Sequence, residues 1–227
     1  MDLYSVKARA TGAKLFITTT QLVFILIAAL ILFGPLQSAF ATWPGVSSDQ
    51  SLRRTILIIF SLITLVRFSL MMFVFLKRAI GPAEMVSVPA AFFIYYVGFS
   101  ILVLPYGGGF DIFDLAGIVL FVVGAGLNTM AEYERHRFKA DPANAGKLYT
   151  GGLFSRAMHI NYFGDILWVS GYALVAHHPV GFVVPVALAV FFAFGNIPML
   201  DKHLAKRYGA AFDAYAAKTK KLVPGIW

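Results

Sequence analysis

The chain has 227 residues, of which 59% are hydrophobic and 13% charged, and its mean hydropathy is +0.76. A soluble domain carries about 25% charged residues, so the composition excludes an ordinary water-soluble globular protein. The absence of cysteine excludes disulfides, thiolate zinc sites and cysteine nucleophiles. The net charge of +8 does not indicate a nucleic-acid partner, because the basic residues flank the apolar segments.

Six apolar runs are long enough to cross a bilayer, which requires about 20 residues per helix. They lie at about 15–36, 55–76, 87–105, 113–131, 162–178 and 180–198. The sequence therefore predicts an all-α, polytopic membrane protein with about six transmembrane helices and a single integral membrane domain, residues 1–227. His177, His178 and Pro179 separate the last two runs and predict a solvated outer turn, although a re-entrant pair fits the same pattern.

The basic residues predict the orientation of these spans. With the N-terminus in the cytoplasm, sixteen of the nineteen lysines and arginines are cytoplasmic: Lys7, Arg9, Lys14, Lys77, Arg78, Arg135, Arg137, Lys139, Lys147, Arg156, Lys202, Lys206, Arg207, Lys218, Lys220 and Lys221. Only Arg53 and Arg54 fall outside, and Arg67 lies within a span. The positive-inside rule then predicts that both termini are cytoplasmic.

Polar residues share one helix face at the end of the fourth span. Spaced at steps of four, three and four, they are Asn128, Glu132, Arg135 and Lys139. A polar side chain at membrane depth is costly unless partnered, and it is a functional candidate by default. Glu134 and Arg137 are better interpreted as charges that reach water at the helix end.

The segment Ala145–Trp168 begins polar and glycine-rich and then enters the fifth span. Asn161 fits either a site residue or a helix N-cap. Asp165, one turn further along the same face, needs a hydrogen-bonding or cationic partner, for which Lys139, Lys147 and Arg156 are near in sequence.

Two other features of this segment have simpler interpretations. Gly151 and Gly152 could let backbone amides approach a phosphate, but a glycine pair is more often a turn. His159 has no histidine or glutamate partner at metal-ligand spacing, so no metal site is expected, and an interfacial histidine is the better interpretation.

The C-terminal region predicts an amphipathic helix at the membrane surface. Its apolar stripe consists of Leu200, Leu204, Tyr208, Phe212 and Tyr215, and its basic face contains Lys202, Lys206, Arg207 and Lys218. Such a helix binds anionic membrane lipids or covers a bound cofactor, and the pattern fits both.

The second half of the chain, from Asn128 to Trp227, resembles the C-terminal region of the steroid 5-alpha-reductase family. This family belongs to a superfamily with sterol reductases and isoprenylcysteine carboxyl methyltransferases. The resemblance rests on YTGGLFSRAMHINYFGDILWVSGYAL, residues 149–174, which contains GGLF, then Asn-aromatic-x-Gly-acid, then Gly-Tyr-Ala-Leu. The ending LAKRYGAAFDAYAAKTKKLVP resembles the whole superfamily.

The resemblance implies a nicotinamide cofactor, NADP(H), bound by six residues of this half. They are Asn128, Glu132, Lys139, Lys147, Asn161 and Asp165. Asn128, Asn161 and Asp165 would orient the nicotinamide and ribose, and Lys139 and Lys147 would neutralise phosphate. The steroid enzymes usually have arginine at the basic positions, and lysine cannot form the bidentate phosphate contact.

The implied function is a membrane oxidoreductase that uses NADPH to reduce a carbon-carbon double bond of a lipophilic, steroid- or isoprenoid-like substrate. Residues 1–123 would enclose the substrate and residues 124–227 would bind the cofactor. The Gln-Glu pair of the steroid enzymes is missing, and Phe68 stands at the position of their tyrosine. The catalytic residue is therefore unknown, with Arg67, Tyr95 and Tyr96 as candidates.

Two alternatives remain from the sequence. An S-adenosylmethionine-dependent methyltransferase of the isoprenylcysteine type would place His159 and Asp201 near its cofactor. That family carries Arg-His-Pro where this chain has Met158, His159 and Ile160, and it carries a paired acid near Asp201. A membrane scaffold without chemistry is the non-enzymatic alternative.

Overall fold

The computed structural model describes residues 11–46, 51–106 and 108–227, which form two compact units. The first unit is Met1–Val119 with Gly171–Phe182, and the second is Leu120–Ser170 with Val183–Trp227. Within the described residues no strand forms, and the all-α prediction is confirmed. Lys7 and Arg9, which contributed to the predicted orientation, lie outside the described residues.

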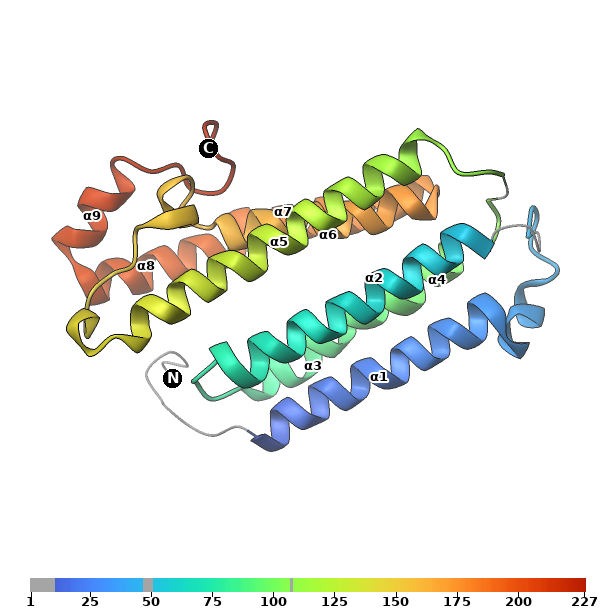
Figure 1. The fold of residues 1–227 in the computed structure, drawn as a ribbon, viewed down its shortest axis with the longest axis horizontal. Helices are drawn as coiled ribbons and strands as arrows, with labels where there is room; N and C mark the ends of the chain where they lie inside the picture. The colour runs from blue at the N-terminus through green and yellow to red at the C-terminus, as the bar shows by residue number, and fades with distance from the viewer. Residues whose placement is uncertain (1–10, 47–50, 107) are drawn as a thin grey trace. The chain divides into compact units, whose positions relative to one another are not determined.

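The first unit is built on long apolar helices (Figure 1). Helix α1 (Thr11–Phe33) packs against α2 (Ser51–Leu70) and α3 (Pro82–Phe93). One π-helical turn (Met71–Phe75) extends α2, and another (Ile94–Gly98) joins α3 to α4 (Phe99–Leu102). The ends follow local chemistry, since Pro35 cannot continue the hydrogen bonding of α1, and Pro82 occupies the first turn of α3.

A buried ion-pair cluster closes one end of the first unit. Arg53 Nε lies 2.9 and 3.0 Å from the two carboxylate oxygens of Asp114, and Arg53 Nη2 donates to the Gly109 carbonyl at 2.8 Å. The Nε2 atom of His177 lies 3.0 Å from Asp114 Oδ1, and only 14% of the His177 side chain is exposed. The prediction of a solvated His177 is therefore wrong, because the turn after α6 packs this ring against the carboxylate.

The second unit contains the other helices. It takes α5 (Ile112–Ala140) from Leu120 onward and α6 (Ile160–Ala176) up to Ser170, followed by α7 (Val183–Phe191), α8 (Ile197–Tyr208) and α9 (Ala210–Ala216). Gly209, with φ +51°, ends α8, so the predicted amphipathic helix is broken into two. Phe212 and Tyr215 of α9 then pack on Met158 in a buried cluster.

Five helical stretches are long and apolar enough to cross a membrane: Thr11–Phe33, Leu52–Phe75, Pro82–Leu102, Ile112–Ala140 and Pro179–Tyr208. The other predicted span corresponds to α6, whose 17 residues reach only the lower limit of about 17–25 residues for a crossing. The last predicted span and the start of the amphipathic helix form one continuous stretch through a π-helical turn, Phe192–Asn196.

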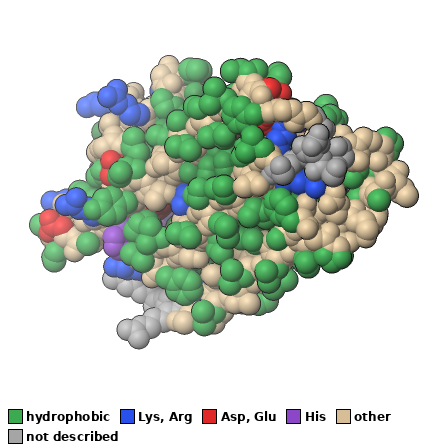
Figure 2. Space-filling view, turned by 45° about the vertical axis from the view of Figure 1, so that its right-hand side comes forward, with side chains coloured by type: hydrophobic (Ala, Val, Ile, Leu, Met, Phe, Trp, Pro, Cys, Tyr) green, Lys and Arg blue, Asp and Glu red, His purple; other side chains and the backbone are tan. Residues whose placement is uncertain are grey.

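Large apolar side chains cover much of the visible surface (Figure 2). Leu26 in the first unit is 64% exposed and Phe194 in the second is 81% exposed, among many others. Water would oppose such exposure, whereas lipid tails are as apolar as these side chains. The chain is thus a multi-pass integral membrane protein, and the cytoplasmic placement of its termini stays a prediction.

Candidate functional site

Four of the six predicted cofactor residues form one hydrogen-bonded group in the second unit. Asn128 Nδ2 donates to Asp165 Oδ1 at 2.9 Å and to the Asn161 carbonyl at 3.2 Å. Asn161 Nδ2 donates to Glu132 Oε1 at 3.0 Å. We call Asn128, Glu132, Asn161 and Asp165 the amide–carboxylate network, and it joins α5 to the first turns of α6.

The surroundings of the network hold its two carboxylates in place. Trp168 Nε1 donates to Asp165 Oδ1 at 2.8 Å, so two neutral donors, from Trp168 and Asn128, bind this carboxylate. Glu132 forms an ion pair with Arg135 one turn along α5. Asn161 is the second residue of α6 and is buried, which rules out the N-cap interpretation.

Two glycines allow the close helix contact on which the network depends. A Cβ atom on Gly164 would lie 2.7 Å from the Gly124 carbonyl oxygen and 2.8 Å from the Asn128 nitrogen. A Cβ atom on Gly124 would lie 2.4 Å from the Trp168 nitrogen. Only glycine at both positions lets α5 and α6 approach so closely that the short Asn128 side chain reaches α6.

The Gly151–Gly152 pair builds a turn, as the simpler interpretation predicted. Gly152 has φ +52°, and a Cβ atom there would lie 2.2 Å from Glu134 Oε2. The same Glu134 oxygen accepts a hydrogen bond from Leu153 N at 2.9 Å. Glu134, which the sequence assigned to a solvated helix end, instead anchors the Gly152–Ser155 turn to α5.

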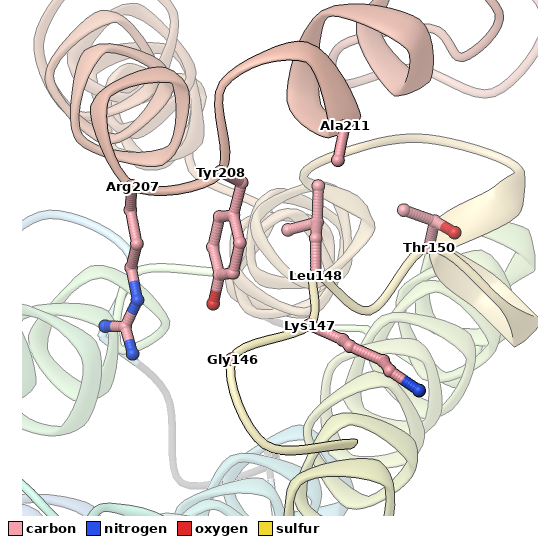
Figure 3. A pocket seen from close by; sticks show the side chains of 7 residues that line it. All are labelled: Gly146, Lys147, Leu148, Thr150, Arg207, Tyr208 and Ala211. Atoms are coloured by element: carbon pink, nitrogen blue, oxygen red, sulfur yellow. The ribbon is translucent and has the colours of Figure 1, made fainter. Parts of the chain in front are cut away.

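The two predicted lysines make no hydrogen bond or ion pair with the network within the described residues. Lys139 is exposed near the end of α5, where Arg135, Arg207 and Glu132 contribute to its electrostatic environment. Lys147 lines a pocket of about 430 Å³ between the loop after α5 and the α8–α9 junction. The other lining residues are Gly146, Leu148, Thr150, Arg207, Tyr208 and Ala211 (Figure 3).

The sequence did not single out Arg207 or Tyr208 as site residues. It placed Arg207 on the basic face of a predicted amphipathic helix and assigned it no role in a site. Both residues lie in the last turn of α8, just before the break at Gly209, and line the pocket together with Ala211 of α9 and the loop at residues 146–150. Gly209 could have predicted the helix break from sequence. Nothing in the sequence indicates that the loop at residues 146–150 lies beside the end of α8.

His159 is buried within the protein, and its place at the membrane interface stays a prediction. Only 2% of its surface is exposed, and its Nε2 atom lies 2.9 Å from Asp201 Oδ1. Backbone hydrogen bonds explain the burial, because the amides of Met158 and His159 donate to the carbonyls of Lys220 and Lys221, each at 2.8 Å. The C-terminal segment therefore covers His159, and the methyltransferase alternative's two residues lie in direct contact.

The first unit contains the candidate catalytic residues. Tyr96, which is 1% exposed, donates its hydroxyl hydrogen to Gln21 Oε1 at 2.9 Å. Gln21 is fully buried, and within the described part of the chain its Nε2 atom has no hydrogen-bond partner. Tyr95 is also buried, and Arg67 is partly buried within α2. A buried donor without an acceptor is costly, so Gln21 is one polar group of this unit with a hydrogen-bond donor to spare.

Comparisons with known proteins agree with the sequence resemblance. Over 123 residues the chain is 27% identical to human 3-oxo-5-alpha-steroid 4-dehydrogenase 2, covering 54% of this chain and 46% of that protein. It is 31% identical over 116 residues to steroid 5-alpha-reductase DET2 of Gossypium hirsutum, covering 50% and 42%. It is also 40% identical over 95 residues to the "Probable O-methyltransferase ustE" of Ustilaginoidea virens, covering 40% and 32%.

The chain therefore spans about a third to a half of the length of the curated relatives that it matches. A family model described as "Protein of unknown function (DUF1295)" matches residues 85–219, starting well before Asn128, where the sequence resemblance began. That range is more than half of the chain and includes the entire amide–carboxylate network. The protein thus belongs to the DUF1295 family, a steroid 5-alpha-reductase-like family of membrane proteins.

Proposed function

We propose that this protein is a membrane reductase that uses NADPH to reduce an activated carbon-carbon double bond of a lipophilic substrate. The observation that carries the proposal is the amide–carboxylate network. Its hydrogen bonds join residues that are 29 to 37 positions apart in sequence and that the resemblance implies bind one cofactor.

The residues of the second unit fit a nicotinamide dinucleotide in their chemistry. Amides and carboxylates, as in Asn161 and Asp165, suit the carboxamide and ribose hydroxyls of such a cofactor, because they offer both donors and acceptors. Lys147 offers positive charge for phosphate at the pocket of about 430 Å³, a size within the usual range for small-molecule sites. When bound, the reduced nicotinamide supplies a hydride.

The protein's own part is orientation and charge stabilisation. The network fixes the Asn161 and Asp165 side chains before a ligand arrives, which reduces the entropy cost of binding. In the first unit, the Nε2 hydrogens of Gln21, which have no partner among the described residues, suit a substrate oxygen on which negative charge develops, and the hydrogen bond from the Tyr96 hydroxyl holds this amide in place. The steroid or isoprenoid nature of the substrate, suggested by the names of the relatives, is part of the proposal.

The test is thermal unfolding of the detergent-purified protein with NADPH, NADH and S-adenosylmethionine. A ligand that binds only the native state at 100 times its Kd stabilises by about 2.7 kcal/mol. We expect NADPH to raise the melting temperature and Asn161→Ala to abolish this rise. Asn196→Ala is the matched control, since Asn196 lies in the same unit and makes no side-chain hydrogen bond with the described residues.

The methyltransferase is the second candidate, favoured by one observation, the direct His159–Asp201 contact. Stabilisation by S-adenosylmethionine alone, lost on Asp201→Asn, would replace the reductase proposal with this one. No response to any of the three ligands would refute both enzymatic proposals and favour a scaffold.

A further inference from the structure

Three side chains that can bind a metal ion meet in the ion-pair cluster at the end of the first unit. Asp111 and Asp114 lie at the start of α5, and His177 directly follows α6. One ligand atom from each lies within 4.8 Å of the other two. Within the described ranges, no other three histidine or carboxylate side chains meet in this way. The sequence did not predict the group, because Asp114 and His177 are 63 positions apart.

The spacing of these atoms is close to that of two ligands on one zinc ion. The Nε2 atom of His177 lies 3.0 Å from Asp114 Oδ1 and 3.6 Å from Asp111 Oδ1. Zinc binds nitrogen and oxygen ligands tetrahedrally at about 2.0–2.2 Å, so two of its ligands lie roughly 3.3–3.6 Å apart. Small side-chain movements would therefore bring all three atoms onto one ion and leave its fourth position for water.

Arg53 holds the two carboxylates in position for such an ion. Its Nη2 atom lies 3.3 Å from Asp111 Oδ2, whereas His177 approaches Asp111 Oδ1. Its Nε atom lies 2.9 and 3.0 Å from the two oxygens of Asp114. The amides of Phe113 and Asp114 donate to Asp111 Oδ1 at 2.8 and 3.2 Å. Hydrogen bonds of this kind orient the carboxylates that bind a metal, and a carboxylate oxygen can accept more than one bond.

The charges of the cluster favour a bound cation. The two carboxylates and the Arg53 guanidinium leave a net charge of −1 when His177 is neutral. The Asp114 side chain is fully buried, where an unbalanced charge is costly. The Asp111 side chain is 43% exposed, so an ion can reach the cluster from solvent. A zinc ion requires a neutral imidazole and ionised carboxylates, which are the states that create this charge deficit.

The backbone of His177 supports the same conclusion. His177 has φ +54°, and it is the one residue other than glycine with a positive φ in the described part of the chain. This left-handed conformation is unfavourable because it brings the Cβ atom close to the following carbonyl oxygen. It places Nε2 beside the two carboxylates, and the Phe113 ring packs on the imidazole at 5.9 Å between centroids. Strained residues persist where the surrounding contacts fix them, and they cluster at ligand sites.

We propose that Asp111, Asp114 and His177 bind a zinc-class divalent ion, with Arg53 orienting the carboxylates. An imidazole next to two carboxylates suits zinc and its transition-metal neighbours, whereas Mg²⁺ and Ca²⁺ prefer oxygen ligands alone. The ion would join the start of α5 to the end of α6 and stabilise the first unit. The cluster shares no residue with the amide–carboxylate network, so this inference is independent of the proposed reductase.

The experiment measures zinc bound to the full chain, purified in detergent without a polyhistidine tag and stripped with EDTA. Zinc content is determined by mass spectrometry after equilibrium dialysis against Zn²⁺, and thermal unfolding is recorded with and without Zn²⁺. Asp111→Asn and His177→Gln each remove one ligand. Asparagine caps helices as well as aspartate, so Asp111→Asn keeps the start of α5 intact. His178→Gln is the matched control, because His178 is the next residue and accepts a hydrogen bond from Val180 N at 3.1 Å, outside the cluster.

We expect wild type and His178→Gln to bind one zinc ion per chain and to unfold at a higher temperature with it. Asp111→Asn and His177→Gln should weaken zinc binding by at least about 10-fold, the smallest loss typical of changing only a residue that supports a ligand. If wild type takes up no zinc, or if all three variants bind it equally, the proposal is overturned. Stabilisation by acid alone, lost in His177→Gln and with no zinc bound, would show that a proton on His177 balances the charge, and would overturn it as well.

Discussion

The substitution Gly164→Ala tests whether close packing of α5 on α6 creates the amide–carboxylate network. The new Cβ atom would lie 2.7 Å from the Gly124 carbonyl oxygen, whereas ordinary contacts begin at 3.4 Å. Because both facing groups are backbone, the clash is relieved only if the helices separate by roughly 0.7 Å at this point. Overpacking of this kind costs about 1–3 kcal/mol.

The same separation would break the network. The Asn128–Asp165 hydrogen bond is 2.9 Å long, and lengthening it by roughly 0.7 Å would exceed the limit of about 3.2 Å for a good N–H···O bond. We therefore expect Gly164→Ala to lower the melting temperature by about 2–12 °C, at about 2–4 °C per kcal/mol. The stabilisation by NADPH should fall with it.

The assay is thermal unfolding in detergent, with and without NADPH, next to Gly126→Ala as control. Gly126 is also on α5, and nothing lies within 4 Å of its missing Cβ atom, so alanine there should be neutral or slightly stabilising. If Gly164→Ala unfolds at the wild-type temperature and keeps its NADPH response, the packing argument is refuted.

Two further predictions concern contacts outside the network. Arg53→Gln should lower the free energy of unfolding by about 3–5 kcal/mol, because it leaves the buried Asp114 carboxylate without its guanidinium partner. The double variant with Arg53→Gln and Asp114→Asn should recover much of this loss. If thermal unfolding shows the same loss for the single and the double variant, the prediction is contradicted. Burial, and then the charge of Asp201, raise the pKa of the Tyr215 phenol above its ordinary value, so its stabilising hydrogen bond to the Phe154 carbonyl should be lost only as pH rises beyond about 10. Tyr215→Phe should be about 1 kcal/mol less stable at pH 8 and should show a flatter decline between about pH 10 and 12, whereas parallel pH profiles would contradict the assignment.

Periodicity predicted the helix faces correctly because it depends only on spacing. Asn128 and Glu132 lie on one face of α5, and Asn161, Asp165 and Trp168 lie on one face of α6, as their steps of three and four required. The partner of Asp165 was predicted among cations close in sequence. The structure supplies Asn128, 37 positions away, because Gly124 and Gly164 set the separation of α5 and α6.

His159 and His177 also have partners that are distant in sequence and that the sequence did not predict. The sequence placed His159 at the membrane interface and His177 in a solvated turn, and it assigned a protein partner to neither. One is covered by the C-terminal segment, and the other is packed against Asp114. Neither the covering backbone nor the carboxylate is near in sequence, so no local pattern could reveal the burial.

The sequence by itself determined the class of protein, since long apolar runs with few charges can satisfy their backbone groups in lipid only as helices. It also determined which residues of the second half carry the family resemblance. Only the tertiary structure decided that four of the six predicted residues share one network, with which Lys139 and Lys147 make no hydrogen bond or ion pair among the described residues, and that Arg207 lines a pocket. Those outcomes depend on the close approach of α5 to α6 at Gly124 and Gly164 and on the helix break at Gly209. Both bring together parts of the backbone that are far apart in sequence.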